Sequence, residues 1–132
     1  MDLRILEIAS NTENNKVIDN FTHKSKNRNS ICGDEMEISL IVKNDKIVDM
    51  GYQCKSCIYC QASVSLLSQK LKKKNVNEIK EFLSTSEKIF DDVKVNFEIK
   101  WLDFKELFDK KNIKRKECLL LPLKTVSKAL KF

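Results

Sequence analysis

Three cysteines and one aspartate, drawn from separate parts of this chain, could together form a metal site. Cys32 and Asp34 share one short segment, while Cys57 and Cys118 come from two later segments. Thiolate sulfur is a soft ligand that selects zinc or iron–sulfur clusters. Three thiolates and one carboxylate supply the four ligands that such sites commonly use. The residues therefore indicate a site for zinc or for an iron–sulfur cluster, and the choice between the two stays open.

The other two cysteines, Cys54 and Cys60, allow two interpretations. Cys54 and Cys60 flank Cys57 with the spacing Cys54-x-x-Cys57-x-x-Cys60, which resembles the spacing of zinc ligands. Free cysteines are often small buried hydrophobic residues, so burial in a core is the plain alternative for every cysteine in the chain. For Cys54 and Cys60 we favour that structural role, and a redox or accessory-ligand role is the alternative.

Cysteine usage also bears on the compartment. The sequence holds five cysteines, an odd number, and its first residues lack the basic and then apolar pattern of an export signal. We therefore expect reduced thiols and a cytoplasmic protein. The single histidine, His23, lies in a polar stretch where we expect it to be solvated. Its isolation disfavours Cys–His nucleophilic catalysis, and we expect no enzymatic activity.

Composition predicts one helix-rich globular domain spanning residues 1–132. Hydrophobic residues make up 42% of the chain and charged residues 33%, with only two glycines and one proline to interrupt helices. The net charge of +6 is spread along the sequence without an interleaved stacking-aromatic pattern, so nucleic-acid binding is not expected. A basic surface could instead meet an acidic protein partner. No segment approaches the ~20 apolar residues of a membrane span.

Hydrophobic periodicity predicts the elements of the first half. A short helix is expected over Leu3–Ala9, and a mobile loop over residues 19–30. Apolar residues alternate over 36–42 and again over 46–52, which predicts two strands joined by a turn at Asn44 and Asp45. Because such a hairpin reverses the chain, residues just before its first strand and just after its second should be neighbours. Cys32 and the segment from Cys54 to Cys60 should therefore lie at the same end.

Helices are expected in the second half. The pattern over residues 61–71 predicts a helix with Cys57 just before it or in its first turn, where the partial positive charge of a helix N-terminus favours a thiolate. Small residues at its start, Ala62, Ser63 and Ser65, should allow close packing. A further helix is expected over 77–83.

The region after residue 92 is ambiguous. Alternation over residues 93–99 predicts a strand, whereas the next apolar residues have helical spacing: Trp101, Phe104, Leu107 and Phe108. We expect this stripe to be core. A closing helix should hold Pro122 in its first turn, with Cys118 at or just before its start.

Taken together, these segments resemble the iron–sulfur cluster assembly scaffolds of the IscU, SufU and NifU N-terminal family. Cys32, Gly33 and Asp34 are similar to the family's Cys-Gly-Asp element. Cys57, followed by Ala62-Ser63-Val64-Ser65, resembles its Cys and Ala-Ser-Ala-Ser helix, and Arg115 with Cys118 resembles its Arg-x-x-Cys element. The resemblance covers nearly the whole chain. One departure is the absence of an Asn-Pro element. Another is Glu117, which stands where many members have His or Lys; it is either an alternative ligand or a solvated carboxylate, and we favour the solvated carboxylate.

The resemblance implies an α+β fold in which helices pack on one face of a small antiparallel sheet, with the metal site at one tip. It implies that Cys32, Asp34, Cys57 and Cys118 are the ligands. Members receive sulfur from a cysteine desulfurase, build a transient [2Fe-2S] cluster with iron, and pass it to acceptor or carrier proteins. SufU-like members instead bind zinc and accept sulfur from the desulfurase. A small structural zinc module is the third possibility.

Overall fold

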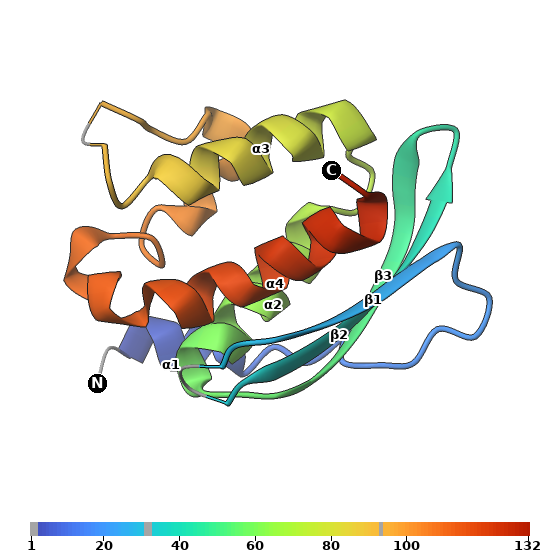
Figure 1. Cartoon of the computed structure of the whole chain (residues 1–132), viewed down its shortest axis with the longest axis horizontal. Helices are drawn as coiled ribbons and strands as arrows, with labels where there is room; N and C mark the ends of the chain where they lie inside the picture. The colour runs from blue at the N-terminus through green and yellow to red at the C-terminus, as the bar shows by residue number, and fades with distance from the viewer. Residues whose placement is uncertain (1–2, 31–32, 93) are drawn as a thin grey trace.

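The chain folds into a three-stranded antiparallel sheet with helices on one face, which confirms the α+β architecture that the family resemblance implies. A computed structural model describes residues 3–30, 33–92 and 94–132. The strands lie in the order β1 (His23–Arg28), β2 (Glu35–Lys43) and β3 (Lys46–Lys55). The α-helices are α1 (Leu3–Ala9), α2 (Ile58–Lys70), α3 (Val76–Lys88) and α4 (Lys116–Leu130), and two 3₁₀ helices, η1 (Ile99–Phe104) and η2 (Lys110–Arg115), precede α4. Figure 1 shows this arrangement.

The hairpin of β2 and β3 matches its prediction. The two strands pair antiparallel from Lys43 opposite Lys46 down to Glu35 opposite Lys55. Asn44 and Asp45 make the turn with positive φ angles of 52° and 60°, a conformation that Asn and Asp tolerate better than most residues and that two-residue hairpins require. The far end of the hairpin therefore brings the residues before β2 next to those after β3.

The expectation of a mobile loop over residues 19–30 is wrong, because β1 occupies the middle of that segment. It pairs antiparallel with β2, from His23 opposite Leu40 to Arg28 opposite Glu35. Its residues alternate between half-buried and exposed, but the half-buried ones are polar, so hydrophobic periodicity could not reveal the strand. Polar contacts to α4 help hold it: the Ser25 hydroxyl donates to the Thr125 carbonyl (2.6 Å), and Lys128 Nζ donates to the Lys26 carbonyl (2.8 Å).

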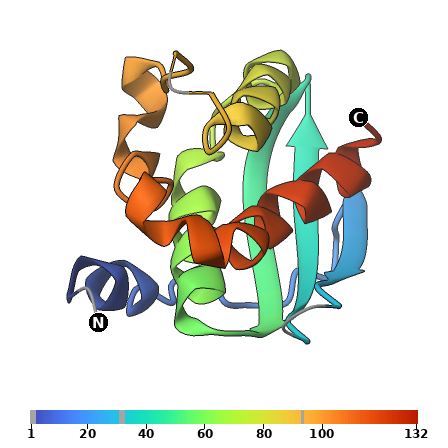
Figure 2. The same ribbon diagram turned by 60° about the vertical axis from the view of Figure 1, so that its left-hand side comes forward.

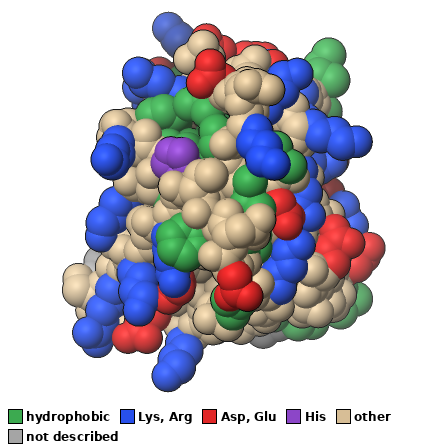
Figure 3. Space-filling model, turned by 90° about the vertical axis from the view of Figure 1, so that its right-hand side faces the viewer, with side chains coloured by type: hydrophobic (Ala, Val, Ile, Leu, Met, Phe, Trp, Pro, Cys, Tyr) green, Lys and Arg blue, Asp and Glu red, His purple; other side chains and the backbone are tan. Residues whose placement is uncertain are grey.

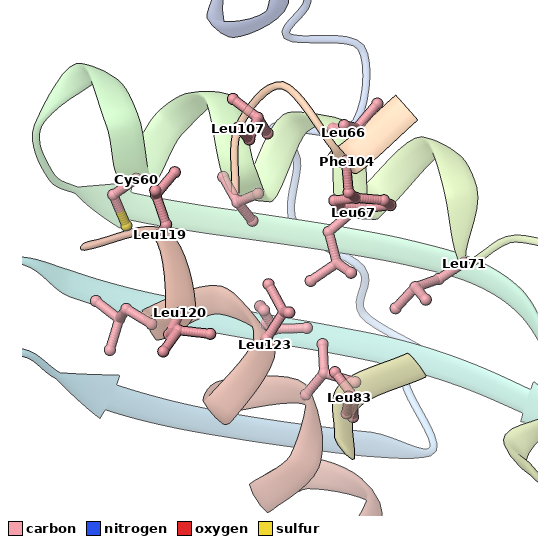
Figure 4. Close-up of a cluster of buried hydrophobic side chains, with 14 of the residues drawn as sticks. Cys60, Leu66, Leu67, Leu71, Leu83, Phe104, Leu107, Leu119, Leu120 and Leu123 are labelled. Atoms are coloured by element: carbon pink, nitrogen blue, oxygen red, sulfur yellow. The ribbon is translucent and has the colours of Figure 1, made fainter. Parts of the chain in front are cut away.

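Helices α2 and α4 form the layer that covers the sheet (Figure 2). Their apolar side chains meet those of β2 and β3 in one buried cluster, part of which is drawn in Figure 4. The small residues at the start of α2 are buried as expected, and two of them bond to neighbouring segments. The Ser63 hydroxyl donates to the Leu119 carbonyl of α4 (2.6 Å), and the Ser65 hydroxyl donates to the Asn11 carbonyl (2.6 Å). Close approach of α1 and α4 to α2 depends on these short side chains.

The opposite face of the sheet is crossed by the chain segment between α1 and β1. Ile18 of this segment is buried, and the Tyr52 N–H of β3 donates to the Asn14 carbonyl (3.1 Å). Gly51 lies beneath it: a Cβ there would come within 2.6 Å of the Lys16 carbonyl oxygen. The glycine is needed because only a residue without a side chain lets the two backbones approach this closely.

Helix α3 and the segment after it form an aromatic side of the core. Phe82 of α3 stacks on Trp101 with ring centroids 4.3 Å apart and contacts Phe104 at 4.7 Å, which confirms that the aromatic stripe is core. The strand expected over 93–99 is wrong, since residues 94–98 form no strand. Alternation is nevertheless present in their burial, because Phe97 points into the aromatic cluster while its neighbours face solvent.

The closing helix begins earlier than expected. Pro122 lies inside α4 rather than in its first turn, and Cys118 is the third residue of the helix. Pro122 has no N–H to donate to the Cys118 carbonyl, so the helix spans this position with one fewer backbone bond. The run Leu119–Leu123 is buried, which supplies the packing that holds the helix through the proline. Among the described parts of the chain, no helix is long and apolar enough to cross a membrane.

Candidate metal centre

Three of the four predicted ligands converge at one end of the sheet. One ligand atom each from Asp34, Cys57 and Cys118 lie within 4.8 Å of one another, although the residues are far apart in sequence. The fourth, Cys32, lies outside the described residues, and its place at the site remains a prediction. Spacing of this kind is what three groups need if they are to bind one metal ion or one small cluster.

Asp34 is held in the connection between β1 and β2. The Asn29 N–H donates to its carbonyl oxygen (2.8 Å), and Gly33 beside it has a φ of 74°, which suits a glycine. The Asp34 side chain is only 5% exposed. Its Oδ1 accepts the backbone N–H of Cys57 (3.1 Å), whereas Oδ2 is buried and receives no hydrogen bond from any described residue. A buried carboxylate oxygen of this kind is costly unless something binds it.

Cys57 is the N-cap residue of α2, as the sequence predicted. Its backbone is extended (φ −70°, ψ 168°), its carbonyl accepts the Gln61 N–H (3.0 Å), and its side chain makes no capping hydrogen bond. The thiol is therefore not engaged in capping the helix. Next to it, the Tyr59 ring lies under the Arg115 guanidinium at 5.3 Å, which joins the start of α2 to the residue just before α4.

Cys118 reaches the site from the first turn of α4. It is 1% exposed, and Asp34 is nearly as buried, whereas Cys57 is half-buried. The three groups thus form a mostly buried cluster in which Cys57 is the most accessible member. Of these three described groups, Cys57 is the one that a reagent or partner delivering an atom to the site would meet first.

The remaining two cysteines lie beside the site without joining the cluster of close ligand atoms. Cys60, in α2, is fully buried, and Cys54, near the end of β3, is half-buried. Burial raises the pKa of Cys60 far above its ordinary value, and the charges of Asp34, Cys54 and Cys57 raise it further. Burial also raises the pKa of Cys54, with Asp34 adding to the effect. The preferred structural role fits the burial of Cys60.

Two other expectations have different outcomes. Glu117 carries a half-exposed side chain that pairs with Lys124 Nζ (3.2 Å), as a solvated carboxylate would. His23 was expected in a loop, but it begins β1 and is half-buried, with its Nδ1 2.9 Å from the Thr22 hydroxyl. The Tyr59–Arg115 contact was missed, because a pair this distant in sequence leaves no signal in residue spacing.

Comparison with known proteins shows the family to which this chain belongs. The model of the family described as NifU-like N terminal domain matches residues 2–100, most of the chain. The chain belongs to the NifU-like N-terminal domain family. The matched region holds Cys32, Asp34 and Cys57, while Cys118 follows it. The resemblance inferred from the short motifs is confirmed.

Individual relatives agree with this membership. The chain is 29% identical over 133 residues to the iron–sulfur cluster assembly scaffold protein IscU of Thermotoga maritima, covering 96% of this chain and 89% of that protein. A second relative is a candidate iron–sulfur cluster assembly scaffold protein for the SUF system from Fervidobacterium islandicum, known from a crystal structure. The two structures superpose with a TM-score of 0.88 at 26% sequence identity, and the match covers 98% of this chain and 96% of the other. The N-terminal part of a NifU-like protein from Brucella abortus shares the fold, with a TM-score of 0.90 at 19% identity over 98% and 91% of the two chains.

Proposed function

We propose that this protein is an iron–sulfur cluster assembly scaffold, and that the 132-residue chain acts as a single scaffold domain. The observation that carries the proposal is the convergence of Asp34, Cys57 and Cys118 ligand atoms within 4.8 Å in a member of this family. The cluster is cargo: it is built at the site and then leaves for an acceptor protein.

The donor set suits this cargo. Thiolates bind iron in clusters, and a carboxylate oxygen is a harder and weaker partner for such a centre. Oδ2 of Asp34 is available as a ligand atom because it is buried and accepts no hydrogen bond from a described residue. The other carboxylate oxygen, Oδ1, accepts the Cys57 N–H. We propose Cys32, Asp34, Cys57 and Cys118 as the ligands. One weak oxygen ligand among thiolates favours release.

We further propose that a cysteine desulfurase supplies the sulfur as a persulfide and that the assembled form is [2Fe-2S]. Cys57 is the proposed first acceptor, since it is the most accessible of the three described ligands. A groove of about 780 Å³ at the same end of the sheet offers a docking surface. Its basic lining residues outnumber its acidic ones and comprise Lys26, Arg28, Lys55 and Lys128, against Glu35 and Glu37.

A zinc-bound sulfur acceptor is the second candidate, because ligand atoms within 4.8 Å of one another also suit a single ion. Such a protein would stimulate a desulfurase without carrying a cluster. A cytoplasmic location stays a prediction for either function.

Cluster transfer tests the two candidates against each other. The protein is incubated anaerobically with a cysteine desulfurase, cysteine, ferrous iron and a thiol reductant that converts persulfide sulfur to sulfide. It is then separated from small molecules and mixed with an apo-ferredoxin. A scaffold should pass on a cluster, the Cys57→Ser variant should not, and Glu117→Gln should behave as the parent because Glu117 only pairs with Lys124. Retention of tightly bound zinc, with sulfur uptake and no transferable cluster, would contradict the scaffold and support the sulfur acceptor.

A further inference from the structure

Cys57 and Cys60 are placed as a dithiol at the start of α2. Cys57 is the N-cap, and because α2 begins at Ile58, Cys60 is the third residue of the helix. An N-cap side chain lies over the third helical residue, which is why the two interact in capping boxes. Residues three apart on a helix have Cβ atoms about 5–6 Å apart, and a disulfide needs about 3.5–4.5 Å. A small movement of the N-cap residue, which lies outside the regular helix, would bring the two sulfurs into bonding distance.

The two thiols differ in access. Cys57 is half-buried, whereas Cys60 is 0% exposed and points into the core beside Leu119 (Figure 4). Cys54 and Cys57 are both near enough to Cys60 for their charges to raise its pKa. Among the described cysteines of this segment, external reagents therefore reach Cys57 and Cys54 but not Cys60, which can react only with a group that a neighbouring cysteine carries. An accessible cysteine at a helix N-terminus with a buried partner three residues later is the arrangement of dithiol oxidoreductases.

Cys54 has the same sequence separation from Cys57 but a different geometry. It lies in β3, which continues to Lys55. The chain rises about 3.3 Å per residue in a strand and about 1.5 Å in a helix, so the strand takes Cys54 away from Cys57 faster than the helix takes Cys60. Cys60 is therefore the better placed of the two to reach Cys57.

We propose that Cys60 resolves a persulfide formed on Cys57 and thereby releases its outer sulfur as sulfide. This step rests on the proposed function, which places the persulfide on Cys57. The Cys60 sulfur attacks the inner sulfur of the persulfide, a Cys57–Cys60 disulfide forms, and the sulfur–sulfur bond of the persulfide breaks. The outer sulfur leaves with the bonding electron pair and takes the Cys60 proton, so that persulfide and thiol give disulfide and hydrogen sulfide. The two cysteine sulfurs supply the two electrons that reduce the outer sulfur.

The same step sets an order of events at the metal centre. While the disulfide exists, Cys57 is not available as a ligand, so a thiol reductant must reopen the bond before a cluster can be held. Cys57 would then take part first in sulfide production and, after the disulfide is reduced, in cluster binding.

A single-turnover experiment tests this inference. Reduced protein is mixed anaerobically with one equivalent of glutathione persulfide, with no other reductant, and sulfide is measured over time against a Cys57→Ser blank. Samples are alkylated, digested and analysed by mass spectrometry. The parent should release sulfide and acquire a Cys57–Cys60 disulfide. Cys60→Ser should release sulfide at least about tenfold more slowly and keep an additional sulfur atom on Cys57. Cys54→Ser, the matched control, should behave as the parent.

Each other outcome overturns the inference in a distinguishable way. If the parent and Cys60→Ser both keep the extra sulfur on Cys57 and release sulfide equally, Cys60 does not resolve the persulfide, although sulfur acceptance by Cys57 stands. A disulfide between Cys54 and Cys57 would show that Cys54, and not Cys60, resolves the persulfide. If Cys57 gains no sulfur in either protein, sulfur acceptance itself is wrong. Far-ultraviolet circular dichroism of Cys60→Ser checks that this buried substitution leaves the fold intact.

Discussion

At the scale of single residues, Asp34 combines an observed hydrogen bond with a proposed role as a ligand. One oxygen accepts the Cys57 N–H and fixes the start of α2, while the other is buried and open to a metal. Sequence motifs could suggest the aspartate as a ligand, but not its bond to the Cys57 backbone. That bond depends on the hairpin bringing two distant segments together, which residue types alone do not encode.

Two variants should separate these roles. Asp34→Asn keeps an oxygen that can accept the Cys57 N–H but loses the charge, so zinc affinity should fall about tenfold or more with little change in the free energy of unfolding. Asp34→Ala should lose zinc affinity similarly and also about 1–3 kcal/mol of stability, because the Cys57 N–H loses its partner. Zinc competition with a chromophoric chelator and urea denaturation measure the two quantities. Equal stability of both variants would show that the hydrogen bond contributes nothing.

At the scale of elements, the sheet is sandwiched between a helical layer and a single chain segment. Periodicity predicted the β2–β3 hairpin, α1 and α2, because their buried residues are apolar. It failed for β1, whose inward residues are polar and whose partners are backbone groups of β2 and α4. It also failed for residues 94–98, where Phe97 is buried by neighbouring aromatic rings and not by a paired strand. Alternating apolar residues indicate that one side of a segment is buried, but they do not show which neighbouring element buries that side.

Gly51 tests the segment that crosses the outer face of the sheet. In Gly51→Ala the added Cβ would meet the Lys16 carbonyl oxygen at 2.6 Å, so the segment must lift away. We expect a loss of about 1–3 kcal/mol in the free energy of unfolding, measured in urea. Val48→Ala on the same strand, where the parent side chain is half-exposed, should cost no more than about 0.5 kcal/mol. A Gly51→Ala protein as stable as the parent would mean that the segment does not press on the sheet.

At the scale of the whole molecule, charge is dispersed. Lysine and arginine side chains are spread over the face drawn in Figure 3, with acidic groups between them. On that face the basic side chains of this chain, whose net charge is +6, form no continuous track of the kind that nucleic acid needs. The groove near Asp34 is the place where excess positive charge lies next to the proposed chemistry. A partner with an acidic surface would suit this groove, whose lining includes Cys54.

Salt should therefore weaken binding of a cysteine desulfurase. Raising ionic strength from about 0.05 to 0.5 M should reduce affinity about tenfold, measured by biolayer interferometry, because screening removes the attraction between exposed charges. Lys55→Glu, in the groove, should weaken the complex more than Lys43→Glu, which makes the same charge change at the opposite end of the hairpin. Affinity that is unchanged by salt, or equal effects of the two variants, would argue against docking at the groove.

We propose that Asp34, Cys57 and Cys118 hold a cluster together with Cys32. The most direct measurement is the visible absorption spectrum after anaerobic reconstitution with ferrous iron and sulfide, recorded for the parent and for Cys57→Ser. We predict sulfur-to-iron charge-transfer bands in the parent that the variant loses. A colourless parent, or a variant with the same bands as the parent, would contradict the account.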